Sequence, residues 1–481
     1  MLTPMTRYLR HGGRRTLSRL ICFPIALYCL IRLLLFFSFR SSSPATALSL
    51  FSFASSRCDG RYVFMHDLPP RFNADLLRDN CALSPWVGDA CHFADNGGFG
   101  TDLGDGWYVT SQFALEFIFH DRMRRYECLT GDPARAAAFF VPFYAGVELL
   151  PHLWGTNTTV RDAVALDLVR WLRARPEWAA MGGRDHFMVA GRITWDFRRQ
   201  SEEDGDWGSK LFWLPELQNM TTLLIESSPW QENDVAIPYP TYFHPSTAGE
   251  LAAWQNRVRH QKRPWLFSFA GAPRPNNTDI ARDVIIQQCR ASPLCKLLDC
   301  AGDNAHECFS PRRITELFSS SVFCLQPLGD SYTRRSAFDA MVGGCIPVFF
   351  HPGSAYVQYV WHLPRDFRNY SVFIPMEELK PGNGAIERTL SRISPEQASA
   401  MREAVVGMMP SLVYGNKRTT GEEGEFKDAF DLAVEKVIER VEKRKRDTKQ
   451  GIEQVASDES YNWKKALLNG GVGWEHYFNQ K

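Results

Sequence analysis

The sequence lacks an excess of charge of either sign, because its 481 residues include 55 Lys and Arg against 54 Asp and Glu. A net charge of +1 argues against a general nucleic-acid-binding protein, which needs many basic side chains to neutralise phosphates. Long repeats and low-complexity tracts are also missing from the first half of the chain. With 44% apolar and 23% charged residues the composition is that of a globular protein, and the length predicts two domains of roughly 150–200 residues each.

Two common types of ligand motif are absent as well. The chain contains neither a GxGxxG fingerprint nor a P-loop, and its cysteines form no pair of CxxC motifs, which structural zinc sites favour. Ten cysteines lie between Cys58 and Cys345, an even number that fits disulfide bonding in an oxidising compartment. Two disulfides are therefore expected among Cys289, Cys295, Cys300 and Cys308. We interpret Cys324 and Cys345, at the ends of predicted strands, as buried residues.

The N-terminus carries positive charge ahead of an apolar run. Five arginines precede that run: Arg7, Arg10, Arg14, Arg15 and Arg19. The run from residue 20 to 39 is about long enough to span a bilayer, and the arginines place the N-terminus in the cytosol by the positive-inside rule. Arg32 costs about 2–3 kcal/mol at the bilayer centre unless it snorkels or finds a partner. The alternative is a cleaved signal peptide with an Ala45-Thr46-Ala47 site, but the apolar run is too long for one.

We therefore expect residues 1–19 to form a cytosolic tail, residues 20–39 an uncleaved transmembrane signal-anchor and residues 40–57 a stem rich in Ser and Ala. The rest of the chain would then lie in the lumen of the secretory pathway. Four Asn-x-Ser/Thr sequons agree with that location. Their asparagines are Asn157, Asn219, Asn276 and Asn369.

Strand-like and helix-like segments alternate after residue 58, which predicts an α/β protein. In a first domain, residues 58–245, the expected strands are Arg61–Met65, Phe139–Val141, His186–Gly191, Leu223–Ile225 and Val235–Ile237, and the expected helices are Trp107–Tyr126 and Val160–Arg175. A second domain, residues 246–445, follows a proline-rich linker. Its expected strands are Trp265–Phe269, Val322–Leu325, Ile346–Phe350 and Ser371–Pro375. Residues 446–481 show little pattern and are expected to form a loosely ordered tail.

The stretch Cys324–Phe350 is the most informative part of the chain. It predicts a strand, a polar loop, a helix from about Thr333 and a second strand, a βαβ unit whose loop lies at the carboxyl ends of the strands. Arg334 and Arg335 fall in the first helical turn, where cations oppose the macrodipole, so they indicate an anionic ligand such as a nucleotide diphosphate. Asp339, on the same helix face, is placed to accept hydrogen bonds from a ribose. The ordinary explanation is an Arg335–Asp339 surface ion pair.

Two loops contribute further candidates for binding that ligand. Before the helix, Gly329 permits a tight turn, and Asp330 and Ser331 are able to cap the first helical turn. After the strand that begins the second domain, Gly271 permits close approach of the backbone to a ligand, and Arg274 is placed to reach a phosphate. An ordinary strand-to-helix turn explains this second loop equally well.

Five segments together carry a resemblance to a known family. They are RYVFMHDLPPRFN (Arg61–Asn73), AAAFFVPFYAG (Ala136–Gly146), RDHFMVAGRITWDFRR (Arg184–Arg199), RPWLFSFAGAPR (Arg263–Arg274) and CLQPLGDSYTRRSAFDAMVGGCIPVFFHPGSAY (Cys324–Tyr356). With these segments in this order, the chain from about residue 58 to 440 resembles the plant exostosin-type glycosyltransferases of family 47, most of all their xyloglucan galactosyltransferase group. The likeness fades in the stem, at residues 200–206 and in the tail.

The resemblance implies a GT-B architecture, in which two Rossmann-like domains, the first for the acceptor and the second for the nucleotide sugar, enclose a cleft. It implies an inverting transfer of galactose from UDP-galactose to xylosyl side chains of xyloglucan, for the cell wall. It also implies a single-pass type II protein of the Golgi membrane with a luminal catalytic domain, with other wall-synthesis glycosyltransferases as possible partners and no nucleic acid. No metal or other cofactor is expected, because GT-B enzymes balance the leaving diphosphate with positive side chains and a helix N-terminus, and no DxD motif is placed to bind a metal.

By this resemblance the donor site consists of Gly329, Asp330, Ser331, Arg334, Arg335 and Asp339, with Arg192, Gly271 and Arg274 as further candidates. An inverting transfer also needs a general base within hydrogen-bond reach of the acceptor hydroxyl. His66, Asp67 and Asp196 each follow a predicted strand of the first domain and are the candidate bases. Asp67 is equally able to cap the next turn. His66 is equally able to pack in the core. Asp196 is equally able to pair with Arg198 or Arg199.

Two other functional classes stay open. A sibling transferase would use UDP-galacturonic acid, an arabinose donor or another hemicellulose acceptor, and no residue excludes it. A non-catalytic carbohydrate-binding or scaffold subunit would keep the fold without the chemistry, but the intact Arg334, Arg335 and Asp339 argue against it. Four tryptophans are candidates for stacking on sugar faces, although most tryptophans lie in cores. They are Trp107, Trp195, Trp207 and Trp230.

Overall fold

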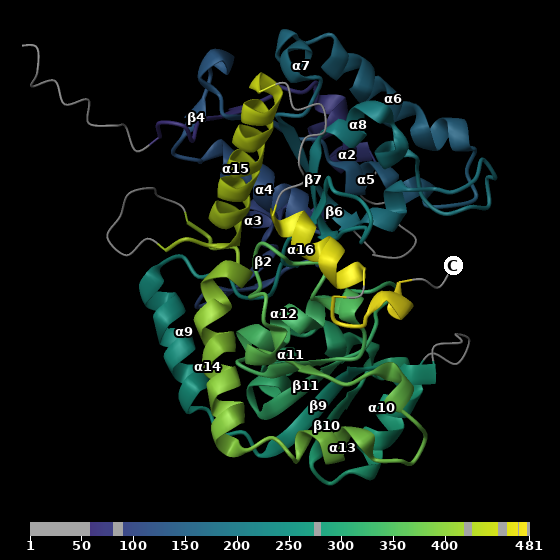
Figure 1. The fold of residues 1–481 in the computed structure, drawn as a ribbon, viewed down its shortest axis with the longest axis vertical. Helices are drawn as coiled ribbons and strands as arrows, with labels where there is room; N and C mark the ends of the chain where they lie inside the picture. The colour runs from purple at the N-terminus through teal and green to yellow at the C-terminus, as the bar shows by residue number, and fades with distance from the viewer. Residues whose placement is uncertain are drawn as a thin grey trace, which may run out of the picture. The chain divides into compact units, whose positions relative to one another are not determined.

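The computed structural model of the chain describes residues 58–79, 90–273, 280–417, 426–450, 459–469 and 471–478. These residues form an α/β fold with two parallel sheets and helices packed around them (Figure 1). The expected signal-anchor, the stem, Arg274 and Asn276 lie outside the described residues. Within the described part, no helix has both the length and the apolar character needed to cross a membrane.

The first sheet has the strand order β4-β1-β5-β6-β7-β8, and every pair of neighbours is parallel. Its strands are β1 (Val63–Met65), β4 (Leu129–Thr130), β5 (Ala138–Val141), β6 (His186–Ile193), β7 (Thr221–Glu226) and β8 (Asp234–Ala236). The helices of this half are α2 (Ala74–Asp79), α3 (Asp95–Gly98), α4 (Leu115–Arg124), α5 (Ala145–Leu149), α6 (Thr158–Arg173), α7 (Pro176–Met181) and α8 (Pro215–Asn219). Strands β5, β6 and β7 are buried almost throughout, as parallel strands covered on both faces are.

The second sheet has the order β10-β9-β11-β12-β13, again parallel throughout. Its strands are β9 (Trp265–Gly271), β10 (Cys295–Asp299), β11 (Ser321–Gln326), β12 (Ile346–Phe349) and β13 (Val372–Phe373). Its helices are α9 (Ala248–His260), α10 (Ile280–Ala291), α11 (Pro311–Ser319), α12 (Arg335–Val342), α13 (Ala385–Leu390) and α14 (Pro395–Leu412). The predicted βαβ unit is confirmed as β11, α12 and β12.

One large hydrophobic cluster spans both halves, beside a separate cluster around the second sheet. The large cluster contains buried residues of the first sheet such as Phe140, of α12 such as Phe338, and of α15 (Ala429–Lys449) such as Val437. Although α15 follows the second sheet in the chain, it packs against the first half: its start contacts α4, where Phe430 lies 4.9 Å from Phe119, and the helix also contacts β5. Asp428 starts this helix with a capping box. The sheets lie on either side of residue 246 in the sequence, but the chain returns to the first half at α15.

Disulfide bonds link cysteines within the second half. Disulfides join Cys289 to Cys295 and Cys300 to Cys308, which confirms the expectation of two disulfides in this segment. Cys324 and Cys345 also form a disulfide, so their interpretation as simple buried residues is incomplete. The parallel pairing of β11 with β12 brings the two cysteines together, which spacing alone does not reveal.

Two local expectations are wrong. A hairpin of β2 (Thr101–Gly104) and β3 (Trp107–Val109) replaces the start of the helix expected over Trp107–Tyr126, and α4 begins only at Leu115. The hairpin turn includes Asp105 and Gly106 with φ values of 53° and 76°, and Trp107 to Val109 pair with β2 as a strand. The tail is not loosely ordered where it is described. It forms α16 (Glu459–Leu468) and a 3₁₀ turn, and Trp474 and Phe478 are buried.

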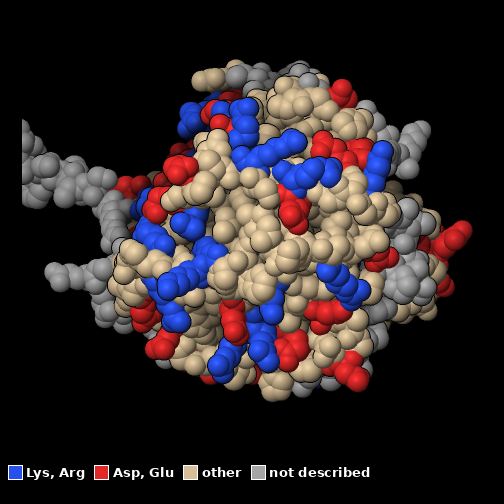
Figure 2. All heavy atoms as spheres, turned by 90° about the horizontal axis from the view of Figure 1, so that it is seen from below, with Lys and Arg blue, Asp and Glu red and all other residues tan. Residues whose placement is uncertain are grey.

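Charged side chains of both signs are interspersed on the face seen from below in Figure 1 (Figure 2). Neither Lys and Arg nor Asp and Glu form a single-sign field there. This distribution agrees with the net charge of +1 and with the absence of a polyanion-binding composition.

Candidate active site

The carboxyl ends of two strands meet at the junction of the two halves. In the first sheet β7 ends at Glu226, and in the second β11 leads into the loop of residues 327–334 before α12. The Ser331 hydroxyl donates to Glu226 Oε2 at 2.6 Å. The backbone N–H and the hydroxyl of Thr333 donate to the same oxygen at 2.7 and 2.6 Å. Three donors therefore converge on one carboxyl oxygen of a residue without exposed surface.

The second carboxyl oxygen of Glu226 is held from the first half. Trp195 Nε1 donates to Glu226 Oε1 at 2.8 Å. Sequence reasoning predicted an anion at the loop before α12 but missed Glu226. The available signal was an acidic residue at the end of the buried strand TTLLIE, because a carboxyl group in such a place has to find donors nearby. In this structure the Glu226 carboxyl accepts the hydrogen bonds that the loop donates.

Several predicted donor-binding residues lie together at the carboxyl edge of the second sheet. Gly329 packs so closely that a Cβ there would lie 2.5 Å from the Thr333 carbonyl oxygen. Arg334 donates to the Ala270 carbonyl at 3.3 Å. Ala270 directly precedes Gly271, where a Cβ would lie 2.6 Å from an aromatic ring of β9. The Arg334 hydrogen bond thus joins the loop before α12 to the end of β9.

Arg335 and Asp339 make their contacts with the first half. Arg335 Nη1 donates to the Thr110 carbonyl at 2.5 Å, and its guanidinium lies 3.5 Å from the centroid of the Tyr242 ring. Arg335 Nε lies 3.2 Å from Asp339 Oδ2, so the expected ion pair exists but is buried and not on the surface. Burial raises the pKa of Asp339 to about 6, against the opposing charge of Arg335. This pair therefore holds α12 against the first half.

Asp196 and Arg192 form a buried pair at the carboxyl end of β6. Arg192 Nε donates to Asp196 Oδ2 at 2.6 Å, and Trp207 Nε1 donates to Asp196 Oδ1 at 2.7 Å. Asp196 therefore pairs with neither Arg198 nor Arg199, which were its expected alternatives. Because both of its oxygens accept hydrogen bonds, Asp196 is fixed in position.

The other two candidate bases have contrasting surroundings. His66 is buried, with its ring stacked on His186 at 5.1 Å and edge-on to Trp171 at 5.7 Å. Burial, followed by the neighbouring His186, lowers the pKa of His66 to about 3, so the ring stays neutral. Asp67 is exposed where the chain leaves β1, and Asp330 is exposed in the loop before α12. The structure thus gives His66 the packing role that was its ordinary explanation.

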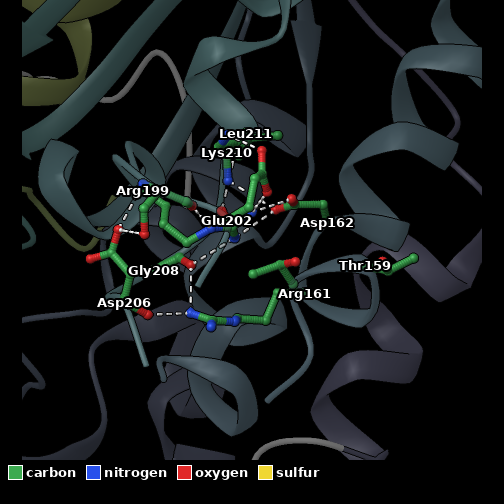
Figure 3. Close-up of polar contacts among 12 residues, drawn as sticks. Thr159, Arg161, Asp162, Arg199, Glu202, Asp206, Gly208, Lys210 and Leu211 are labelled. Atoms are coloured by element: carbon green, nitrogen blue, oxygen red, sulfur yellow. Dashed lines mark hydrogen bonds and ion pairs between the residues drawn. The ribbon is translucent and has the colours of Figure 1, made fainter. Parts of the chain in front are cut away.

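Two buried arginines hold the charged segment Glu202–Asp206 (Figure 3). Arg161 donates to the carbonyls of residues 204, 206 and 208 at 2.6, 2.6 and 3.0 Å. Arg199 donates to both oxygens of Asp162 at 3.2 and 2.7 Å. Trp207 follows this segment and is 41% exposed, so the network presents an aromatic ring to solvent.

The C-terminal segment packs against the loop before α12. Tyr332 of that loop stacks on His351 at 5.1 Å, and Phe478 lies 6.2 and 5.5 Å from these two rings. Tyr477 contacts His351 at 5.1 Å, and Trp195 lies 6.4 Å from Tyr332 on the side of the first half. A row of aromatic rings therefore runs from the first half, across the loop, to the end of the chain.

Known proteins provide the following comparisons. A model of the exostosin GT47 domain matches residues 57–390. Xyloglucan galactosyltransferase MUR3 of Arabidopsis thaliana is 50% identical over 441 residues, covering 89% of this chain and 71% of the relative. Xyloglucan-specific galacturonosyltransferase 1 of the same plant is 42% identical over 392 residues, covering 80% of this chain and 58% of the relative. A solved structure titled "Crystal structure of GtfA/B complex" has a TM-score of 0.31 and 9% identity, covering 68% of this chain and 60% of that chain.

Proposed function

Because the chain belongs to the exostosin GT47 family of glycosyltransferases, we propose that it transfers galactose from UDP-galactose to xylosyl side chains of xyloglucan with inversion. The observation that carries this proposal is the 50% identity, over most of the chain, with a relative named a xyloglucan galactosyltransferase. The two parallel sheets, with loops from their carboxyl ends in contact, support a GT-B arrangement, because open α/β sheets bind ligands at those ends.

The nucleotide sugar belongs to the second half in this proposal. The loop before α12 supplies a backbone N–H and two hydroxyls, which are the groups that bind phosphate oxygens at the start of a helix. Arg334 and Gly271 border the loop and complete a site for the diphosphate. Positive side chains and the helix N-terminus would then balance the charge of the leaving UDP, and no metal is proposed.

The acceptor belongs to the first half. Trp207 and Trp230 are 41% and 48% exposed and follow the carboxyl ends of β6 and β7, which supports a role for them in stacking on sugar faces. The buried network of Arg161 and Arg199 keeps the segment before Trp207 in place (Figure 3). An ordered surface of this kind suits a long, neutral polysaccharide.

A donor and acceptor assay tests the proposed function. Purified protein given UDP-galactose and galactose-free xyloglucan oligosaccharides should release UDP and add a hexose to the oligosaccharide, as mass spectrometry of the product shows. Endoglucanase digestion of the product then locates the modified xylose. Activity should survive EDTA. Release of UDP without a galactosylated product, or no reaction with any xyloglucan acceptor, would contradict the proposal.

A sibling specificity is the second candidate, because a galacturonosyltransferase is among the relatives. The same assay separates the two when UDP-galacturonic acid and UDP-arabinose are offered in place of UDP-galactose. Transfer from UDP-galacturonic acid alone would favour this candidate. Binding of xyloglucan without transfer from any donor would instead favour a scaffold role.

The proposed setting is the Golgi lumen, with residues 20–39 as a type II signal-anchor. Three sequon asparagines among the described residues, Asn157, Asn219 and Asn369, are exposed, as glycosylation requires. Asn157 also caps α6 by accepting from the Thr159 N–H, so its side chain is already oriented at the surface.

Replacing Arg334 with Ala should weaken the binding of UDP by about 1.5–3 kcal/mol, because a charge-assisted contact to the diphosphate is lost. In isothermal calorimetry this is a roughly 10- to 100-fold higher Kd. Arg368→Ala is the matched control, since Arg368 is exposed and pairs only locally with Asp366. An Arg334→Ala variant that binds UDP as tightly as the parent would remove Arg334 from the donor site.

A further inference from the structure

Glu226 occupies the place where the proposed function puts the donor diphosphate. Its Oε2 accepts three hydrogen bonds, from Ser331 and from two groups of Thr333, and Trp195 binds its Oε1. We propose that Glu226 is the general base of the transfer, and that the arriving diphosphate displaces it from the loop and so releases it for that role. This inference rests on the proposed function and adds a residue that the sequence did not suggest.

The donors of the loop fit one anion at a time. A phosphate oxygen takes the same N–H and hydroxyl groups that now bind the Glu226 carboxyl, and two anions in direct contact repel each other. When the diphosphate binds, Glu226 Oε2 therefore loses its three partners. The hydrogen bond from Trp195 Nε1 to Oε1, 2.8 Å in this structure, does not involve the loop and would keep the carboxyl at the junction of the two carboxyl edges. The base becomes available only when the donor is in place.

These groups account for each bond, electron pair and proton in the transfer. The acceptor hydroxyl oxygen forms a bond to the anomeric carbon of galactose, while the bond from that carbon to the UDP oxygen breaks. The electron pair of the broken bond leaves with UDP, whose added charge the loop and Arg334 stabilise. The proton of the acceptor hydroxyl moves to Glu226 Oε2 and later passes to solvent. Attack opposite the leaving group inverts the anomeric carbon.

The predicted bases are less well placed for this step. Asp196 is held by Arg192 and Trp207, and the ring of His66 is buried among other rings. Asp67 is exposed where the chain leaves β1. The Glu226 carboxyl, by contrast, touches the proposed donor loop directly.

Neighbouring contacts hold the two halves together without Glu226. The Ser227 N–H donates to Gln358 Oε1 at 2.8 Å, and Gln358 Nε2 donates back to the Ser227 carbonyl at 3.1 Å. The Tyr359 hydroxyl donates to the Ile225 carbonyl at 2.9 Å. Because these bonds flank Glu226, a Glu226→Gln variant should keep the junction and fold normally.

Glu226→Gln separates a base from a purely structural group. We expect kcat to fall by roughly 10²–10⁴-fold, as for loss of a general base. We expect UDP to bind roughly tenfold more tightly by calorimetry, because a neutral amide holds the loop less strongly than a carboxylate and does not repel the diphosphate. Glu216→Gln, at an exposed Arg173 ion pair, is the matched control and should change neither value.

Three results would overturn the inference. An unchanged kcat in Glu226→Gln excludes the base, and UDP affinity equal to or weaker than that of the parent excludes the displacement. Trp195→Phe is the second variant, informative even if Glu226→Gln does not fold. It should lower kcat roughly tenfold with an unchanged UDP Kd, and an unchanged kcat there contradicts the positioning of Glu226. The UDP titration needs no acceptor, so it still tests displacement if the parent transfers no galactose and the proposed function itself fails.

Discussion

Replacing Asp428 with Asn is expected to lower the free energy of unfolding by about 3–5 kcal/mol, the usual cost of removing one partner of a buried ion pair. Arg122 Nη1 donates to Asp428 Oδ2 at 2.5 Å and to the Gly415 carbonyl at 2.7 Å, and the Gly415 N–H donates to Asp428 at 2.7 Å. The Asp428 side chain is fully buried. Without its charge, the buried Arg122 guanidinium loses its main compensating partner, whereas the amide oxygen of Asn is still able to accept the hydrogen bond that caps α15.

Urea unfolding followed by tryptophan fluorescence measures this change. Glu435→Gln on the same helix is the control, because its ion pair with Lys427 is exposed and should contribute at most about 1 kcal/mol. Equal losses in both variants would show that the buried pair contributes nothing beyond a surface pair.

Acidification should reproduce part of the effect. Burial acts to raise the pKa of Asp428, but the charges of Arg122 and Lys417 outweigh it and leave the pKa below its ordinary value. A carboxyl group with a lowered folded pKa stabilises the fold above its unfolded pKa of about 4 and loses that contribution as the pH falls further. The parent should therefore lose stability below about pH 4 more steeply than Asp428→Asn does.

Replacing Trp474 with Ala should cost about 3–5 kcal/mol, as large-to-small changes of buried aromatic residues do. The indole is 6% exposed and stacks on Tyr356 at 5.2 Å, with the rings nearly parallel. It also lies 5.1 Å from the Phe367 ring and 5.4 Å from the Phe373 ring. The change therefore leaves a cavity in the contact that attaches the end of the chain to the second sheet.

Thermal unfolding of the purified protein measures this second change. Val472→Ala is the control, because Val472 lies two residues earlier and is 46% exposed. If Trp474→Ala unfolds at the temperature of the parent, the C-terminal segment is not part of the cooperative fold.

Local patterns predicted much of the fold. Parallel strands that are buried on both faces appear in the sequence as short apolar runs, so β5, β6, β11 and β12 could be found directly. The hairpin of β2 and β3 was missed because the apolar residues after Trp107 are compatible with a helix, although the Asp105-Gly106 dipeptide at its turn is a hairpin signal. The two-residue strand β4 gives no signal of its own.

The candidate site was predictable only in its second half. The loop before α12 could be identified from glycine, hydroxyl and arginine residues that lie next to one another in the sequence. Its partner Glu226 is 105 residues away from Ser331, and no local pattern joins the two. Likewise, the spacing of four residues suggested the Arg335–Asp339 pair, but only the fold shows that Thr110 and Tyr242 enclose it.

The return of α15 to the first half sets an order of events during synthesis. The ion pair of Arg122 with Asp428 joins residues 306 positions apart, so the first half cannot complete its core while the second is still being made. At roughly 5–20 residues per second a nascent chain needs roughly 15–60 s to cover that distance. During this interval the surface that α15 later covers is open to solvent and available to chaperones.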